Sequence, residues 1–233
     1  MNKPIILTEY PKSGGSWIVS MIGDALDIPK RDIYVRPGFD LFEIAKHPWY
    51  VGAESLNFPS KSIIKSHELP DSSLIDFTAT YIHLVRDGRD VIVSKWFFDK
   101  DFCVNNHITS SFNKSFDDYV EEIAQEWTKY ILTWANKDVL TFHYEDFLFE
   151  PEKLLSGLLR QVYGYDIQKT ILQEAVYKNT KENFSDSLNK TFKHNTFVRK
   201  AISGDWKNYF SKKNIDSFNN VASEAMSLLG YKL

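Results

Sequence analysis

The stretch that decides the fold is residues 5–17, which read IILTEYPKSGGSW. An apolar strand is expected over Ile5–Tyr10, and a helix is expected over Trp17–Leu26 after a short turn that contains Lys12 and two glycines. Glycines let backbone N–H groups converge, the helix N-terminus adds partial positive charge, and Lys12 adds a full charge. The pattern therefore predicts a cradle for an anion.

This turn is not the Walker A loop, because the pattern G-x-x-x-x-G-K-[ST] is missing and Lys12 precedes the glycines. A kinase or ATPase of the usual P-loop type is therefore disfavoured. The hydroxyl groups of Ser13 and Ser16 can donate to the same anion. Taken alone, the segment also fits an ordinary turn between a strand and a helix, so further segments have to decide.

A second segment has the same design. Residues 81–94 read YIHLVRDGRDVIVS, in which a strand over Tyr81–Arg86 ends at a charged turn and a helix follows over Val91–Lys100. Ligands of open α/β sheets lie outside the carboxyl ends of the strands. One such end carries Lys12 and the other carries Arg86 and Arg89, which suits a ligand with two separated phosphates.

A third segment, residues 197–210, reads FVRKAISGDWKNYF and predicts a basic loop around a glycine. The polar stretch before it looks too irregular for a helix. The other expected elements alternate along the chain: a strand over Ser62–Ser66, an amphipathic helix from Phe116 to Trp134, a strand over Val139–Tyr144, and helices over Pro151–Val162 and Gln168–Tyr177. Strands separated by helices predict a three-layer α/β/α fold with a mainly parallel central sheet.

Composition limits the alternatives. A chain of 233 residues with 43% hydrophobic residues is long enough for one well-buried domain, and we expect a single domain over residues 1–233. The net charge of −3 does not suggest nucleic-acid binding. The single Cys103 excludes an intramolecular disulfide and fits a reducing compartment. Because we find neither an 18-residue apolar run nor a signal peptide, a cytoplasmic protein without a membrane span is expected.

Together the segments resemble a known family. They are similar to the motifs of sulfotransferases that use 3′-phosphoadenosine 5′-phosphosulfate (PAPS), which run roughly YPKSGTTW, RDxRDVxVSxxxF and RKGxxGDWKNxF. Residues 65–70, KSHELP, are similar to the KTHLP stretch that carries the base of that family. The matches occur in family order and span most of the chain. The resemblance implies a P-loop-NTPase-like nucleotide-binding architecture and transfer of a sulfuryl group from PAPS to a hydroxyl, with release of adenosine 3′,5′-bisphosphate (PAP).

The resemblance also implies roles for single residues. His67 is the candidate base, because histidine combines a near-neutral pKa with good proton transfer. Lys12 would neutralise charge on the leaving 5′-phosphate, and Lys65 would project toward the sulfuryl group. Because lysines supply this charge, no metal ion is expected, and the sequence has no cluster with metal-ligand spacing.

The cofactor residues carried over from the family form two groups with an adenine contact between them. The 5′-phosphate is assigned to Lys12, Ser13, Gly14, Gly15, Ser16 and Trp17, the 3′-phosphate to Arg86, Ser94, Arg199, Lys200 and Ala201, and the adenine to Trp17 and Tyr144. Two positions depart from the pattern. Gly15 stands where threonine is common, and Ala201 replaces a glycine, which matters only if that position needs a positive φ.

The acceptor and the oligomeric state are left open. Two long stretches, about Pro29–Ser60 and Asp101–Ser115, suggest lids or pocket walls. An aromatic-walled pocket for a small alcohol, phenol, lipid or sugar is expected from aromatic residues in the first stretch and after the second motif: Tyr34, Phe39, Phe42, Trp49, Tyr50, Phe58, Trp96, Phe97, Phe98 and Phe102. Two other hypotheses are a PAP- or PAPS-binding regulatory module without catalysis and a nucleotide kinase on a related fold. Retention of the base and both lysines weighs against the first, and the missing Walker A lysine weighs against the second.

Overall fold

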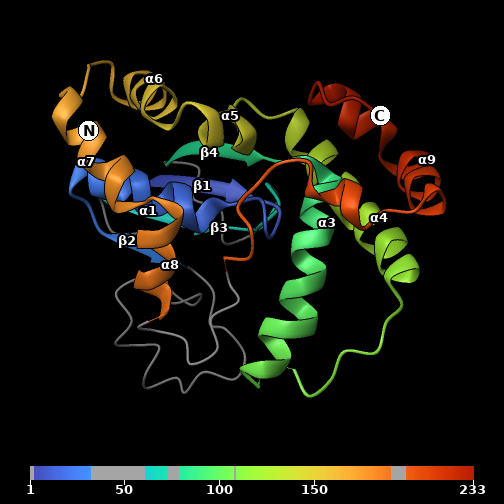
Figure 1. Ribbon diagram of the computed structural model, residues 1–233. Helices are drawn as coiled ribbons and strands as arrows, with labels where there is room; N and C mark the ends of the chain where they lie inside the picture. Colours follow the sequence, from blue (N-terminus) through green and yellow to red (C-terminus); the bar gives the residue numbers. More distant parts are fainter. Residues whose placement is uncertain (1–2, 33–60, 73–78, 108, 190–197) are drawn as a thin grey trace.

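The computed structural model describes residues 3–32, 61–72, 79–107, 109–189 and 198–233 (Figure 1). Its described strands form a five-stranded sheet in the order β2-β3-β1-β4-β5, and every neighbouring pair is parallel. The strands are β1 (Ile5–Glu9), β2 (Lys30–Asp32), β3 (Ile63–Ser66), β4 (Thr80–Val85) and β5 (Leu140–His143). The central strand β1 is the one that leads into the predicted anion cradle.

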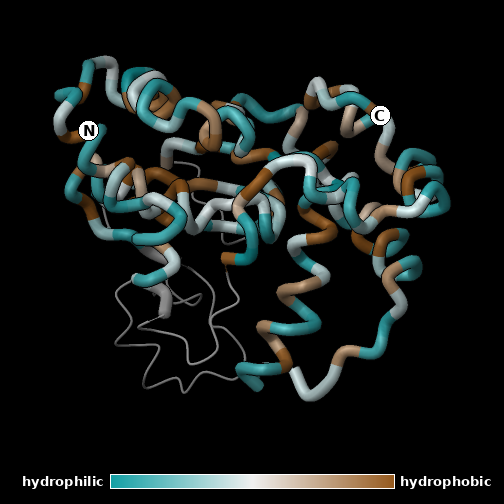
Figure 2. Tube along the Cα trace, viewed as in Figure 1, coloured by the Kyte–Doolittle hydropathy of each residue, from teal (hydrophilic) through white to brown (hydrophobic). Residues whose placement is uncertain are grey.

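Two hydrophobic cores lie on opposite faces of the sheet. Ile5 and Leu7 of β1 pack against α1 (Gly15–Leu26), α6 (Pro151–Tyr163) and α7 (Lys169–Lys178). The other face is covered by α3 (Gly88–Phe97), α4 (Phe116–Ala135) and α9 (Lys212–Leu228), where Trp127 and Phe218 are fully buried. In Figure 1 the first group of helices lies to the left and the second to the right, and Figure 2 shows strongly hydrophobic segments along the central strands. This arrangement confirms the three-layer α/β/α fold with a parallel sheet.

Helix boundaries are set by local capping. The helix after β4 begins at Gly88, not at Val91, because the side chain of Asp87 accepts a hydrogen bond from the backbone of Arg89. It ends at Phe97 and continues as a π-helical turn over Phe98–Cys103, so the second expected loop, Asp101–Ser115, begins with helical residues. Helix α1 begins at Gly15, two residues before the predicted start, and its N-cap residue Gly14 provides no side-chain cap.

Two expectations about secondary structure were wrong. Tyr144 was predicted to end a strand, but it opens the short helix α5 (Tyr144–Phe149) directly after β5. The polar stretch before the third motif was predicted to be irregular, but Lys181–Asn189 forms helix α8. Helix α8 has a weak apolar signal in the sequence, and the buried side chain of Phe184 attaches it to the rest of the molecule. Helix α9, which the sequence reasoning did not place, begins with a capping box between Ser211 and Asn214.

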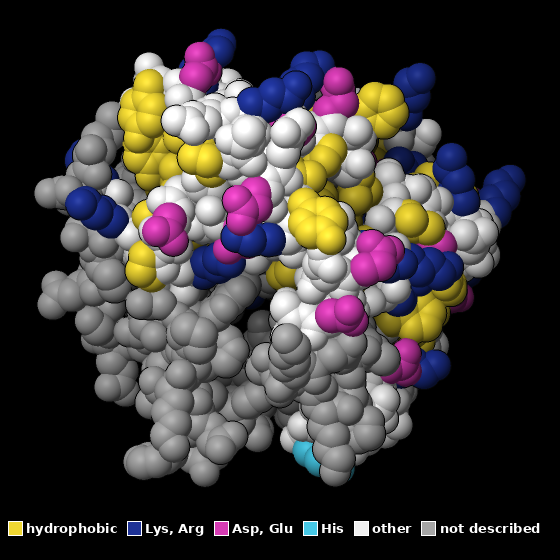
Figure 3. Space-filling model, turned by 60° about the vertical axis from the view of Figure 1, so that its left-hand side comes forward, with side chains coloured by type: hydrophobic (Ala, Val, Ile, Leu, Met, Phe, Trp, Pro, Cys, Tyr) yellow, Lys and Arg dark blue, Asp and Glu magenta, His cyan; other side chains and the backbone are white. Residues whose placement is uncertain are grey.

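The surface carries mixed charge. On the face drawn in Figure 3, basic and acidic side chains are interspersed with apolar ones. Within the described ranges, no helix is both long enough and apolar enough to cross a membrane.

Candidate active site

A cavity of about 610 Å³ lies at the carboxyl ends of the central strands. It is lined by residues from all four motifs, and the predicted site residues among them span 189 positions in the sequence (from Lys12 to Ala201). The predicted site residues that line it are Lys12, Gly14, Gly15, Ser16, Trp17, Lys65, His67, Arg86, Ser94, Tyr144, Arg199, Lys200 and Ala201. The fold therefore brings together the predicted catalytic residues and both sets of residues predicted to bind a phosphate.

The turn between β1 and α1, residues 10–17, is called the phosphate loop below. Its backbone is left-handed at Lys12 (φ 77°) and at Gly14 (φ 105°). A Cβ atom at Gly14 would lie 2.5 Å from the ring of Tyr144, so glycine is required there both for the backbone and for this close approach. The loop is thereby held against the residue that opens α5.

Ser13 has a different position from its predicted partners. It does not line the cavity, and both its backbone N–H and its hydroxyl donate to the carbonyl oxygen of Tyr10, at 3.2 and 2.8 Å. These bonds close the turn from behind. In this conformation Ser13 shapes the phosphate loop, and the donors on the cavity side belong to the residues after it.

The two candidate lysines approach the cavity from different elements. Lys65 lies on β3, paired with Leu7 of β1, and its ammonium group donates to the hydroxyl of Ser16 at 3.3 Å. Lys12 extends from the phosphate loop, and its Nζ lies 4.0 Å from the ring centre of Phe98. Parallel pairing of β1 and β3 is what places both positive charges at the same edge of the sheet.

The candidate base has a defined tautomer. His67 Nδ1 lies 2.9 Å from the backbone carbonyl oxygen of Glu9. A carbonyl oxygen can only accept, so Nδ1 carries the hydrogen, and Nε2 is the basic nitrogen of that tautomer. His83 has the opposite environment: it is buried in β4 between Tyr130 and Trp134, and this burial lowers its pKa to about 4.

Arg86 joins the two halves of the site. Its guanidinium group donates to the carbonyl oxygens of Lys12 and Ile202, at 3.1 and 3.2 Å, and lies 4.4 Å from the ring centre of Tyr144. Arg89, which the sequence reasoning placed beside it, is directed elsewhere. It donates to Asp87 and to the carbonyl oxygen of Lys232, and it does not line the cavity. The expectation that Arg89 contributes to a phosphate site was therefore wrong.

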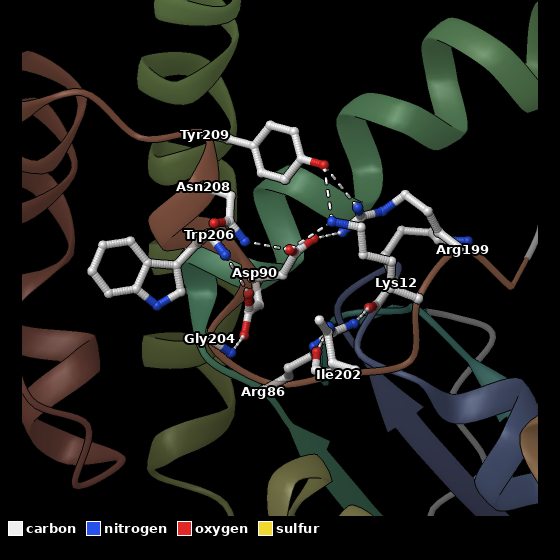
Figure 4. Close-up of polar contacts among 11 residues, drawn as sticks. Lys12, Arg86, Asp90, Arg199, Ile202, Gly204, Trp206, Asn208 and Tyr209 are labelled. Carbon is white, nitrogen blue, oxygen red and sulfur yellow. Dashed lines mark hydrogen bonds and ion pairs between the residues drawn. The ribbon is translucent and has the colours of Figure 1, made fainter.

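The segment from Val198 to Asn208 is called the basic loop below (Figure 4). Arg199 and Lys200 both donate to the carboxylate of Asp205, at 2.6 and 2.8 Å, and both reach the hydroxyl of Tyr209. Burial on its own would raise the pKa of Asp205, but hydrogen bonds from Lys200, Asn208 and Arg199 outweigh it and lower the pKa to about 2. Asp205 therefore orients two cationic side chains of residues that line the cavity.

Asp90 on α3 fixes the other end of the basic loop. Its carboxylate accepts the backbone N–H groups of Gly204 and Trp206, at 2.6 and 2.9 Å (Figure 4). Burial raises the pKa of Asp90, although Arg86 and the two N–H groups oppose this effect. Between these anchors, Ala201 adopts φ 54°, the left-handed conformation in which the glycine common at this position has no steric cost.

The aromatic residues predicted to form the acceptor pocket divide into three sets. Phe98 lines the cavity, whereas Trp96, Phe97 and Phe102 do not. Trp96 packs against Phe112 and Phe116 in the core, which explains its absence from the wall. The six predicted residues of the first long stretch, from Tyr34 to Phe58, lie outside the described residues.

Several lining residues were missed by the sequence reasoning. An apolar wall is formed by α5, α6, α7 and α8, and its members include Phe147, Leu148, Val176 and Phe184. Asn179 was not missed, because its region was considered for an adenine contact, but its match to the family was too loose to assign. It holds Trp17 through a hydrogen bond of 2.7 Å from the indole N–H to its carbonyl oxygen. Glu9 also lines the cavity, and its position as an acidic residue between an apolar strand and a glycine turn was a signal in the sequence. Across the residues that the structure describes, no group of three or more side chains could hold a metal ion.

The fold and the site define a nucleotide-binding α/β protein with a P-loop-like cradle and a second cationic subsite. The sulfotransferase domain family matches residues 2–230, and the chain belongs to this family of PAPS-dependent sulfotransferases. It is 26% identical to mouse sulfotransferase 1 family member D1, over 92% of this chain and 80% of that protein. It is also 26% identical to human sulfotransferase 2A1, over 100% of this chain and 87% of that protein.

Solved structures of this fold agree with the chain over nearly its whole length. Mouse sulfotransferase SULT7A1 in complex with PAP superimposes with a TM-score of 0.70 at 21% identity, covering 97% of this chain and 84% of that one. Retinol dehydratase in complex with retinol and PAP gives a TM-score of 0.72 at 16% identity, covering 100% of this chain and 83% of that one. These structures confirm the fold class that the motifs predicted.

Proposed function

We propose that this enzyme transfers the sulfuryl group of PAPS to the hydroxyl of a small organic acceptor and releases PAP. The observation that carries the proposal is the single cavity in which Lys12, Lys65 and His67 lie together with the cations Arg86 and Arg199. A base and two positive charges at one site, with a second cationic group beside them, match what transfer from a doubly phosphorylated donor requires. The more specific part of this proposal is that the accepting hydroxyl belongs to a small alcohol, phenol, lipid or sugar.

The residues present fit the nucleotide. The cavity volume lies within the range of roughly 300–1,000 Å³ that small-molecule sites usually have. Among the described residues, the Nε atoms of Arg86 and Arg199 are buried without a hydrogen-bond partner. Unpaired buried guanidinium donors are costly, and a phosphate oxygen is the acceptor that best satisfies them. We therefore assign the 3′-phosphate to these two arginines, Lys200, Ser94 and the loop at Ala201.

The other assignments follow from the cavity wall. The 5′-phosphosulfate is assigned to the phosphate loop, with donors from Gly14, Gly15 and Ser16 and charge from Lys12. The adenine is assigned to the space beside Trp17 and Tyr144, whose rings meet edge to face with centres 5.8 Å apart. Ser13 acts in this assignment through the shape of the turn.

The chemical step is assigned to three side chains. His67 Nε2 takes the proton of the acceptor hydroxyl while Nδ1–H stays bonded to the Glu9 carbonyl, which keeps the ring oriented. Lys12 and Lys65 stabilise negative charge on the leaving phosphate and on the sulfuryl oxygens. A small apolar acceptor is supported by Phe98 in the wall and by relatives of this fold, since retinol dehydratase has been solved with retinol and with androsterone.

The experiment that tests the proposal is incubation with sulfur-labelled PAPS and a panel of phenols, steroid alcohols, aliphatic alcohols and sugars. We expect label in a sulfate ester and stoichiometric PAP. PAP binding with no transfer to any acceptor would favour the regulatory module, and phosphoryl transfer from ATP in a parallel incubation would favour the kinase.

The variant His67→Gln separates catalysis from binding. It should lower turnover by roughly 10²-fold or more, as expected for a lost general base, while PAP affinity changes only a few-fold. His143→Gln is the matched control, because His143 bonds the carbonyl oxygen of Leu229 and does not line the cavity. Turnover of His67→Gln close to that of the control would remove His67 from the role of base.

A further inference from the structure

Among the described residues that line the cavity, Glu9 is the one with an acidic side chain. Glu9, the last residue of β1, is only 3% exposed and lines the cavity. Its carboxylate accepts the backbone N–H of Gly15 at 2.6 Å. Gly15 is the first residue of α1, so this N–H is one of the donors that the helix leaves open at its N-terminus. The carboxylate thus holds a donor that the proposed function assigns to the 5′-phosphosulfate.

The position of Glu9 depends on the glycine. A Cβ atom at Gly15 would lie 2.4 Å from the Glu9 carboxylate, which is far inside van der Waals contact. The threonine that is common at this position cannot coexist with the carboxylate where it now lies. Glycine at position 15, which departs from the family pattern, and glutamate at position 9 therefore depend on each other: the carboxylate can take its observed position only because residue 15 has no Cβ atom.

We propose that Glu9 is an affinity-determining residue that weakens binding of the 5′-phosphate end of the nucleotide. This inference rests on the proposed function, because it takes the phosphate loop as the site of that phosphate. A carboxylate and a phosphate that approach the same N–H groups repel each other strongly, since a buried position gives little solvent screening. Glu9 lowers the affinity for PAP and thereby favours release of the product.

The same residue also stabilises the empty loop. A negative charge at the N-terminus of a helix is favourable, and the hydrogen bond to Gly15 orders the first turn of α1 before a nucleotide arrives. The Glu9 backbone carbonyl meanwhile orients His67. One residue thus contacts both the phosphate loop and the base, and only its side chain is assigned the effect on affinity.

The test is a comparison of Glu9→Gln with the wild type by calorimetry. Glutamine keeps the shape and an oxygen that can accept from Gly15, and it removes only the charge. We expect PAP to bind at least about tenfold more tightly to the variant, the effect of removing one close like-charge contact. Adenosine 3′-phosphate, which has no 5′-phosphate, should bind both proteins equally. Glu126→Gln is the matched control, because Glu126 bonds the hydroxyl of Tyr10 and does not line the cavity.

Each outcome decides the inference. PAP affinity of Glu9→Gln that is unchanged or lower would overturn it, as would an equal gain for PAP and adenosine 3′-phosphate. If Glu9→Gln does not fold, as judged by thermal unfolding, Glu9→Thr is measured with the same two ligands and the same expectation. Failure of the wild type to bind PAP at all would instead contradict the proposed function, so the two ideas fail separately.

Discussion

The phosphate loop and the basic loop supply the two cationic walls of one cavity, but they are held in place differently. The phosphate loop lies between a buried strand and a helix, and its own backbone turns at Lys12 and Gly14 give it its shape. The basic loop is held by side chains: Asp90 from α3, and Asp205 within the loop. Local backbone geometry builds the first wall. The second is held by long-range hydrogen bonds from its backbone to Asp90 and by ion pairs within the loop to Asp205.

This difference predicts where substitutions act. In the phosphate loop a side chain that lines the cavity, such as that of Lys12, can be changed without loss of the loop, so its variants should report on chemistry. In the basic loop the charged side chains are part of the support, so its variants should change binding and stability together.

The largest effect is expected for Lys12→Met. Methionine keeps the bulk of the side chain and removes the charge, and kcat should fall on the order of 10²–10³, similar to the loss of one oxyanion donor. The change in KM for PAPS should be smaller, because the charge on the leaving phosphate grows only in the transition state. Steady-state kinetics with Lys129→Met as control would check this, since Lys129 is exposed on α4 and does not line the cavity. A large rise in KM with kcat intact would limit Lys12 to docking.

The next effect concerns Arg199→Ala. Loss of a charged hydrogen bond costs about 1.5–3 kcal/mol, so PAP affinity should fall roughly 10- to 100-fold. Affinity for adenosine 5′-phosphate should change little, because this ligand has no 3′-phosphate. Arg86→Ala should lower the affinity for PAP by as much. It should also lower the affinity for adenosine 5′-phosphate a few-fold, because Arg86 donates to the Lys12 carbonyl oxygen in the phosphate loop. Calorimetry with Arg160→Ala as control is the measurement, and equal losses for both ligands would contradict the assignment of the 3′-phosphate.

A smaller effect is expected for the stability of Asp205→Asn. Removing the charge that pairs with Arg199 and Lys200 should lower the free energy of unfolding by about 1–2 kcal/mol at neutral pH. Because the pKa of Asp205 is lowered to about 2 in the folded protein, its contribution is fully present above its ordinary value of 3.8 and is lost as the pH falls toward 2. Denaturant unfolding of both proteins should therefore show a gap that narrows over this acid range. If the difference in the free energy of unfolding between the two proteins stays constant with pH, the charge of Asp205 does not stabilise the folded protein.

The smallest effect is expected for Ala201→Gly. The left-handed backbone costs an L-residue about 1–2 kcal/mol, which glycine avoids. Glycine also loses more conformational entropy on folding, which offsets about 0.5–1 kcal/mol of that gain in stability. The variant should be more stable by up to about 1 kcal/mol, seen as a small rise in Tm. Ala25→Gly, within helix α1, should instead be destabilised by about 1 kcal/mol. A fall in Tm for Ala201→Gly would mean that the φ of 54° is not strained in the folded loop.

The expected single domain over residues 1–233 and the cytoplasmic location stay predictions. The same holds for the catalytic and cofactor roles given to His67, Lys65 and the residues around them, because shared position in one cavity is geometry and not yet function.

The sequence by itself determined the parallel fold and the motifs whose residues the fold gathers around one cavity. Apolar runs that end in glycine or charged turns depend only on neighbouring residues, so the strand before Lys12 and the strand before Arg86 were visible without a structure. Tertiary structure decided three things that local patterns do not encode. Arg89 bonds Asp87 and the carbonyl oxygen of Lys232, and Ser13 bonds Tyr10 outside the cavity. The Glu9 carboxylate occupies the space that a side chain at position 15 would need. The physical reason is that apolar runs and glycines select the strand and the turn locally. A polar side chain instead chooses among several possible partners, near in sequence for Ser13 and far in sequence for the bond from Arg89 to Lys232, and packing decides which one it takes.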